Sequence, residues 1–159
     1  MNDKMAIDKL QEALRLCSIH SQRMQYAYSK VKQYFPLDKK TYNDLSQDDL
    51  SYIDQLIFRF SKLQDSMGSR LFPALLMCLG EDIEAKPFID LLTLLEKLEL
   101  IDDHQVWLEI RETRNIVTHE YPFIESEIIE GLNALNRHVS LLTDIWNKLD
   151  NYAHSRFEL

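Results

Sequence analysis

Residues 46–67 read SQDDLSYIDQLIFRFSKLQDSM, and this stretch carries both a helix start signal and a helical apolar stripe. Ser46 is a predicted N-cap, and Asp49 stands three residues later at the capping-box position. Leu45 and Leu50 have the spacing of a hydrophobic staple. The apolar residues that follow keep the helical period: Ile53, Leu56, Ile57, Phe60, Leu63 and Met67. The stretch therefore predicts a long amphipathic helix.

The same period recurs along the rest of the chain. Gly68 and Pro73 are expected to kink or break the helix that starts at Ser46, and Gly80 to end it. The sequence predicts four further helices, over about 4–34, 87–98 and 102–119, and from near 126 to beyond 146. Pro36 stops the first of these, since a residue before proline avoids helical angles. Long amphipathic helices joined by short loops bury their apolar faces only against one another. We therefore expect an all-α fold, an up-and-down bundle of about five helices, in a single domain over 1–159.

Composition and charge exclude several classes of protein. The chain has 159 residues, of which 45% are hydrophobic, and its three glycines and four prolines are too few for an all-β fold with many tight turns. No apolar run is long enough to cross a bilayer, and the start MNDKMAIDKL lacks the apolar core of a signal peptide. We expect a cytoplasmic protein with no membrane partner. Cys17 and Cys78 have no ligand-spaced companions, so we expect neither a metal site nor a cofactor.

The formal net charge of −8 opposes non-specific binding to nucleic acid, because affinity for a polyanion comes largely from neutralised phosphates. We expect no DNA partner, and any chemistry on RNA would need a local cluster of positive groups.

The segment 114–121, RNIVTHEY, is the one part of the chain with pointed chemistry. At about 100° per residue, the helix over 102–119 has an apolar face opposite a polar one. The apolar residues are Val106, Ile110 and Val117, and the polar ones are Arg111, Arg114, Asn115, Thr118 and His119. Arg114 and His119 point about 140° apart in an unbroken helix. They act together only if the helix loosens between His119 and Tyr121, where Pro122 disfavours helical angles, or if a second copy completes the site.

The chemistry of such a cluster is narrow. Histidine moves protons near neutral pH, and arginine holds a phosphate and stabilises charge that develops on it. This pairing favours metal-independent cleavage of RNA, in which a 2′-hydroxyl attacks its own phosphodiester. The alternative is structural: polar residues on an amphipathic helix are usually solvated, and the helix dipole alone favours a histidine at a C-terminus.

The pattern R-x-x-x-x-H-x-Y, with Asn directly after the Arg, resembles the signature of the HEPN superfamily. The resemblance is to the HepT-like toxins, which are paired with minimal nucleotidyltransferase antitoxins. Residues 58–68, followed by Leu71-Phe72-Pro73, are similar to the second-helix segment of that group, so the resemblance covers about 46–146. Pro122 and the long connection over 36–45 depart from it.

The resemblance implies an RNase toxin of a toxin–antitoxin pair. Arg114 and His119 match its catalytic pair, which works without metal from a homodimer cleft, and Asn115 matches the polar residue that supports the pair. Tyr121 matches the tyrosine that the nucleotidyltransferase antitoxin modifies with AMP, which silences the toxin. A non-catalytic subunit of such a nucleotidyltransferase is the alternative, and a helical interaction protein is a third.

Two roles are open for Arg111 and two for Asp65. Arg111, one turn before Arg114, is expected either to assist with phosphate or to form a surface ion pair. Asp65 is expected either to pair with one of these arginines across the bundle or to be solvated. The remaining histidines are expected at the surface or at interfaces: His20, His104, His138 and His154. Tyrosines of the N-terminal third are expected in core or dimer packing, with no basic stripe beside them.

Overall fold

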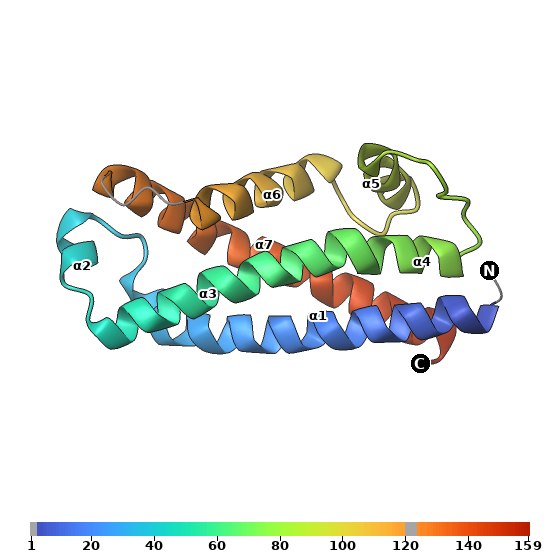
Figure 1. The fold of residues 1–159 in the computed structure, drawn as a ribbon, viewed down its shortest axis with the longest axis horizontal. Helices are drawn as coiled ribbons and strands as arrows, with labels where there is room; N and C mark the ends of the chain where they lie inside the picture. The colour runs from blue at the N-terminus through green and yellow to red at the C-terminus, as the bar shows by residue number, and fades with distance from the viewer. Residues whose placement is uncertain (1–2, 120–123) are drawn as a thin grey trace.

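The computed structural model describes residues 3–119 and 124–159, and in these residues every regular element is a helix (Figure 1). This confirms the all-α class. The longer helices are α1 (Asp3–Val31), α3 (Gln47–Ser66), α6 (His104–Thr118) and α7 (Glu125–Phe157). The shorter ones are α2 (Lys39–Asn43), α4 (Phe72–Cys78) and α5 (Phe88–Lys97). The four longer helices run alternately in opposite directions along the long axis of the molecule, an up-and-down arrangement.

The predicted capping box starts α3. The Ser46 hydroxyl accepts a hydrogen bond from the Asp49 N–H at 3.0 Å, and the Asp49 carboxylate accepts one from the Ser46 N–H at 3.1 Å. Most of the predicted stripe of α3 is fully buried, including Leu56, Phe60 and Leu63. The helix does not break at Gly68: a π turn over Met67–Leu71 joins α3 to α4. Such a turn widens the helix by one residue without interrupting it.

Helix ends follow the predicted signals in some places and not in others. α1 ends at Val31 and is followed by a 3₁₀ turn over Lys32–Tyr34, close to the predicted stop before Pro36. The connection over 36–45 contains α2, which the sequence analysis did not predict. Asp38 caps it, since its carboxylate accepts a hydrogen bond from the Thr41 N–H at 2.7 Å. At the other end of the chain, α7 begins at Glu125 rather than at Ser126.

The buried face of α6 differs from the predicted one. Trp107, Ile110 and Thr113 are buried, whereas Val106 and Val117 are only partly buried. The wheel assumed a helix covered on one side, but α6 packs against both α3 and α7. This second contact turns the side of α6 that bears Arg114 toward α3. Among the described residues, no helix combines the length and apolarity needed to cross a membrane.

Candidate functional site

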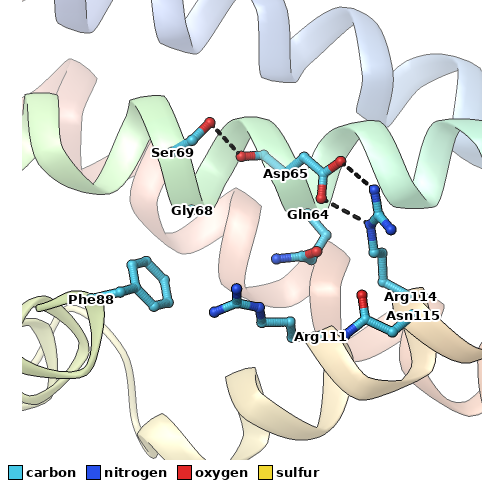
Figure 2. Close-up of a pocket in the computed structure, with 8 residues that line it drawn as sticks. All are labelled: Gln64, Asp65, Gly68, Ser69, Phe88, Arg111, Arg114 and Asn115. Carbon is cyan, nitrogen blue, oxygen red and sulfur yellow. Dashed lines mark hydrogen bonds and ion pairs between the residues drawn. The ribbon is translucent and has the colours of Figure 1, made fainter.

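A pocket of about 450 Å³ lies between α6, α3, the π turn and the start of α5 (Figure 2). It collects three of the predicted site residues, Arg111, Arg114 and Asn115, on the α6 side. Its other lining residues are Gln64, Asp65, Gly68, Ser69 and Phe88. The pocket is therefore built from segments up to about 50 residues apart in sequence; its α6 side and Asp65 were considered from the sequence, whereas Gln64 and Phe88 were not.

Arg114 forms an ion pair with Asp65. Its Nε donates to Asp65 Oδ1 at 3.0 Å and its Nη2 to Oδ2 at 2.8 Å, a bidentate ion pair that joins α6 to α3. The Arg114 Nη1 also donates to the Thr118 hydroxyl at 3.2 Å. Its hydrogen bonds to the Asp65 carboxylate raise the pKa of Arg114 above its ordinary value. Of the two alternatives for Asp65, pairing with an arginine is the one that the structure shows.

Arg111 has a different environment. Its guanidinium carbon lies 5.4 Å from the centre of the Phe88 ring, a cation–π contact. No carboxylate forms a salt bridge with it anywhere in the described residues, so the expected surface ion pair is absent there. Its N–H donors are thus left without an anionic partner, beside the pocket.

Gln64 lies opposite Arg111 and was not predicted from the sequence. Only 5% of this residue is exposed, its side chain extends into the pocket in Figure 2, and it forms no side-chain hydrogen bond in the described part of the chain. Its position on the buried stripe of α3, next to Leu63, gave no signal, because an isolated Gln in an amphipathic pattern is most simply a boundary residue.

His119 ends α6. Its backbone is extended, with φ −74° and ψ 144°, and its N–H donates to the Ile116 carbonyl at 3.2 Å. The predicted loosening of the helix at this residue is confirmed. The His119 residue is exposed and is not among those that line the pocket, so a single copy does not gather the predicted pair in that pocket. Tyr121 and Pro122 lie outside the described residues.

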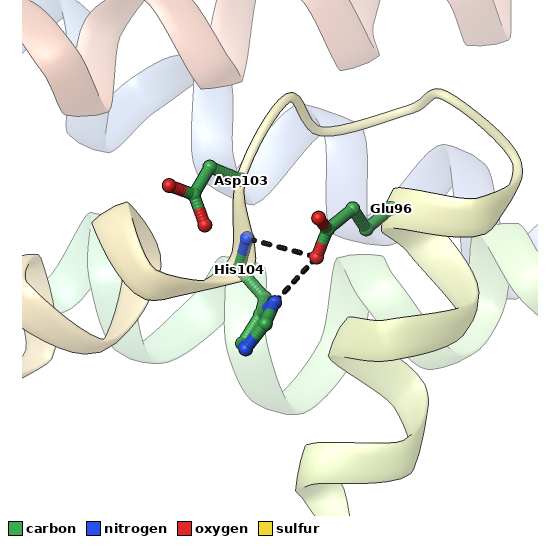
Figure 3. A group of neighbouring side chains, drawn as sticks. All are labelled: Glu96, Asp103 and His104. Carbon is green, nitrogen blue, oxygen red and sulfur yellow. Dashed lines mark hydrogen bonds and ion pairs between the residues drawn. The ribbon is translucent and has the colours of Figure 1, made fainter.

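Glu96, Asp103 and His104 form a second polar cluster, whose ligand-type atoms lie within 4.8 Å of one another (Figure 3). No metal site is expected from the sequence. In this cluster Glu96 accepts hydrogen bonds from both the backbone N–H and the Nδ1 of His104, which lowers the pKa of Glu96. Asp103 accepts from the Gln105 N–H at 2.8 Å and so caps α6. These contacts give each residue a structural role at the start of α6.

One expectation for α1 is corrected. His20 is only 8% exposed rather than at the surface, and its Nδ1 lies 3.0 Å from Arg59 Nη1. Because guanidinium only donates, Nδ1 must accept and the imidazole is neutral. Tyr26 and Tyr52 are accompanied by a cation, since Lys30 lies 5.3 Å and 6.0 Å from the two ring centres. A single lysine is not a basic stripe, so this contact does not contradict the expectation of packing; the Tyr26 and Tyr52 rings pack edge to face, with centres 6.2 Å apart.

Comparison of the chain with models of known protein families, with curated proteins and with solved structures finds no match.

Proposed function

We propose that the protein is a metal-independent endoribonuclease of the HEPN class, a toxin that cleaves RNA with Arg114 and His119. The observation that supports this most directly is the arrangement of α6. It places Arg111, Arg114 and Asn115 together at one pocket and then ends at His119. Cationic and amide side chains at the pocket suit a phosphate, and an exposed imidazole at a helix end suits proton transfer.

The ion pair with Asp65 is compatible with a catalytic Arg114. A guanidinium has five N–H donors. Asp65 takes two of them and Thr118 takes one, so two remain for a phosphodiester. Asp65 in this proposal orients Arg114, while the free donors stabilise the charge that develops on phosphorus during attack by the 2′-oxygen. His119 takes the proton from the 2′-hydroxyl or gives one to the leaving 5′-oxygen.

Because His119 does not line the pocket, the proposal places the reaction between two copies of the chain. Arg114 of one copy and His119 of the other would face the same phosphodiester, as a two-fold axis near the end of α6 allows. Silencing belongs to the same proposal: a minimal nucleotidyltransferase antitoxin attaches AMP to Tyr121, two residues after His119 in the sequence. The added phosphate would compete for the cationic pocket.

The central experiment compares expression toxicity and RNA cleavage in EDTA for wild type, His119→Ala and Arg114→Ala. His154→Ala is the matched control, since His154 is also a partly exposed histidine near a helix end. Wild type and the control should arrest growth and cleave RNA, and the two site variants should do neither. Equal cleavage by wild type and His119→Ala would overturn the proposal.

A mixing experiment tests the two-copy site. Arg114→Ala and His119→Ala are each inactive in the proposal, but a mixed dimer has one site with both native residues. Random pairing makes half of the dimers mixed, so a one-to-one co-expression should recover about a quarter of wild-type activity. No recovery, or a monomer by light scattering, would place the pair within one copy.

The ion pair between Asp65 and Arg114 also suits an arginine with a purely structural role, and this observation favours a second candidate function. In that case the chain is a non-catalytic subunit that binds a minimal nucleotidyltransferase. Co-purification with such a nucleotidyltransferase, without RNA cleavage or toxicity from any variant, would favour it.

A further inference from the structure

We propose that the pocket between α3, α5 and α6 binds one unpaired nucleotide of an RNA strand, with its phosphodiester on Arg111 and its base edge on the Gln64 amide. This rests on the proposed action on RNA, and it adds a base-selecting subsite that the sequence pattern does not contain. The pocket combines a hydrogen-bonding amide, a stacked guanidinium and a small residue at its floor, and each of these supports the proposal separately.

Gln64 supplies the first argument. It is 95% buried, counted from its 5% exposure, yet its carboxamide has no hydrogen-bonding partner among the described residues. The Gln64 amide atoms are not among the fully buried unpartnered atoms of the described residues, so they are open to the pocket, and a carboxamide open to a pocket is suited to a ligand. It offers one acceptor and two donors in a plane, which matches the paired donor and acceptor groups along the edge of a nucleobase.

Arg111 and Phe88 supply the second argument. The contact between them holds the guanidinium beside the pocket without using its N–H groups on a carboxylate. A planar guanidinium in that state forms charge-assisted hydrogen bonds to phosphate oxygens. The Phe88 ring also stacks on Phe72, with ring centres 6.3 Å apart, so its part is to hold Arg111 in place.

The charge of the lining residues selects the kind of phosphate. Two arginines and one aspartate leave one net positive charge at the pocket. A phosphodiester within a strand carries one negative charge, so it matches this balance better than a terminal phosphate with two. The chain as a whole carries −8, which adds to the preference for a singly charged group.

Gly68 lines the pocket without a side chain and so leaves space in it. A Cβ at this position would lie 3.5 Å from the buried Trp107 ring, 3.6 Å from the Phe88 ring and 3.8 Å from Gln64 Nε2, all ordinary contact distances. Gly68→Ala should therefore fold normally and still narrow the pocket. The volume of about 450 Å³ is within the range of small-molecule sites.

The test is calorimetric titration with four 2′-O-methyl dinucleotides, one for each base, which cannot undergo attack by a 2′-hydroxyl. Inorganic phosphate is the anion-only probe. Wild type should bind the dinucleotides more tightly than phosphate and should prefer some bases. Gln64→Leu should remove that preference with a loss of about tenfold for the favoured base, and Arg111→Gln should weaken all four by a similar factor. Gly68→Ala should weaken binding while its thermal melt stays near that of wild type.

Arg156→Gln is the matched control. Arg156 also lies over a phenylalanine ring, 5.3 Å from the centre of Phe157, but in the last turn of α7. It should bind as wild type does. The proposal is overturned if no dinucleotide binds, if phosphate binds as tightly as the dinucleotides, or if Gln64→Leu and Gly68→Ala bind as wild type does.

His119→Ala separates this proposal from the catalytic one. It should bind the dinucleotides like wild type and lose cleavage. If His119→Ala loses cleavage while Gln64→Leu and Arg111→Gln bind as wild type does, the nucleotide-binding proposal is refuted and the RNase proposal is retained. If His119→Ala still cleaves RNA while Gln64→Leu and Arg111→Gln show the expected binding losses, the RNase proposal is refuted and the nucleotide-binding proposal is retained.

Discussion

Replacing Asp65 by Asn removes the carboxylate that holds Arg114 by two hydrogen bonds, and the structure sets the size of the effect. The bonds of 3.0 and 2.8 Å are bidentate and charge-assisted, which places the pair among the stronger surface ion pairs. However, the two side chains are 30% and 40% exposed, so water and salt screen them. We expect a loss of about 1 kcal/mol in the free energy of unfolding. For a domain of this size, that loss lowers Tm by roughly 2–4 °C.

The assay is a double-mutant cycle by urea denaturation, with Asp65→Asn, Arg114→Gln and the double variant. If the two side chains act through each other, the double variant should lose about as much as either single one, with a coupling energy of about 1 kcal/mol. Losses that simply add would refute the interaction. A single-variant loss above about 3 kcal/mol would mean that the pair behaves as a buried one, contrary to its exposure. In RNA cleavage, Asp65→Asn should keep most of the activity that Arg114→Gln loses.

Three further predictions concern the rest of the bundle. Burial, followed by the charges of Arg59 and two other cations, lowers the pKa of His20, so the unfolded chain takes up a proton first. The free energy of unfolding in urea should thus fall as pH drops through about 6.5 and level off below the lowered pKa of the folded state. His20→Asn still accepts a hydrogen bond from Arg59, and it should flatten this pH dependence. An unchanged slope in that variant would contradict the assignment to His20. Burial raises the pKa of Cys17 to about 12, so iodoacetamide at pH 8 should label Cys17 only after unfolding, as mass spectrometry would show. In Gly131→Ala the new Cβ would lie 3.2 Å from Ile116 Cγ2, but Ile116 is 38% exposed and can shift, and alanine favours the helix by about 1 kcal/mol. Stability should change by less than about 1 kcal/mol, and a loss above about 2 kcal/mol in a thermal melt would show that the end of α6 is rigid.

The sequence predicted correctly those features of the fold that depend on neighbouring residues. The Ser46 capping box, the stripe of α3 and the end of α6 at His119 depend on residues within one or two turns, and the structure contains all three. The short helix α2 escaped notice because its only strong signal is the cap at Asp38. The kink expected at Gly68 is a π turn instead, since the choice between breaking and widening depends on the packing around it.

The site was predictable in part, and Asp65 was the residue of α3 that the sequence offered as an arginine partner. Arg111, Arg114 and Asn115 were found because they share α6 with His119, whereas Gln64 and Phe88 come from other helices. The orientation of α6 depends on its two neighbours, α3 and α7, so a wheel with one buried face placed Arg114 on the solvent side. The ion pair with Asp65 shows that this face meets α3.

Charge gives the pocket its selectivity in this proposal. On a chain with net charge −8, RNA gains little from the surface at large, and attraction depends on the few N–H donors of Arg111 and Arg114 that no carboxylate occupies. Binding that releases only one or two counterions falls slowly with added salt, with a slope near −1 for a single strand, whereas a basic surface gives a steep one. With so few phosphate contacts, most of the binding energy in this proposal has to come from the fit of one nucleotide to Gln64 and the rest of the pocket. The proposal therefore predicts recognition of a short unpaired element of RNA rather than of RNA in general, because the negative net charge opposes binding of the polymer.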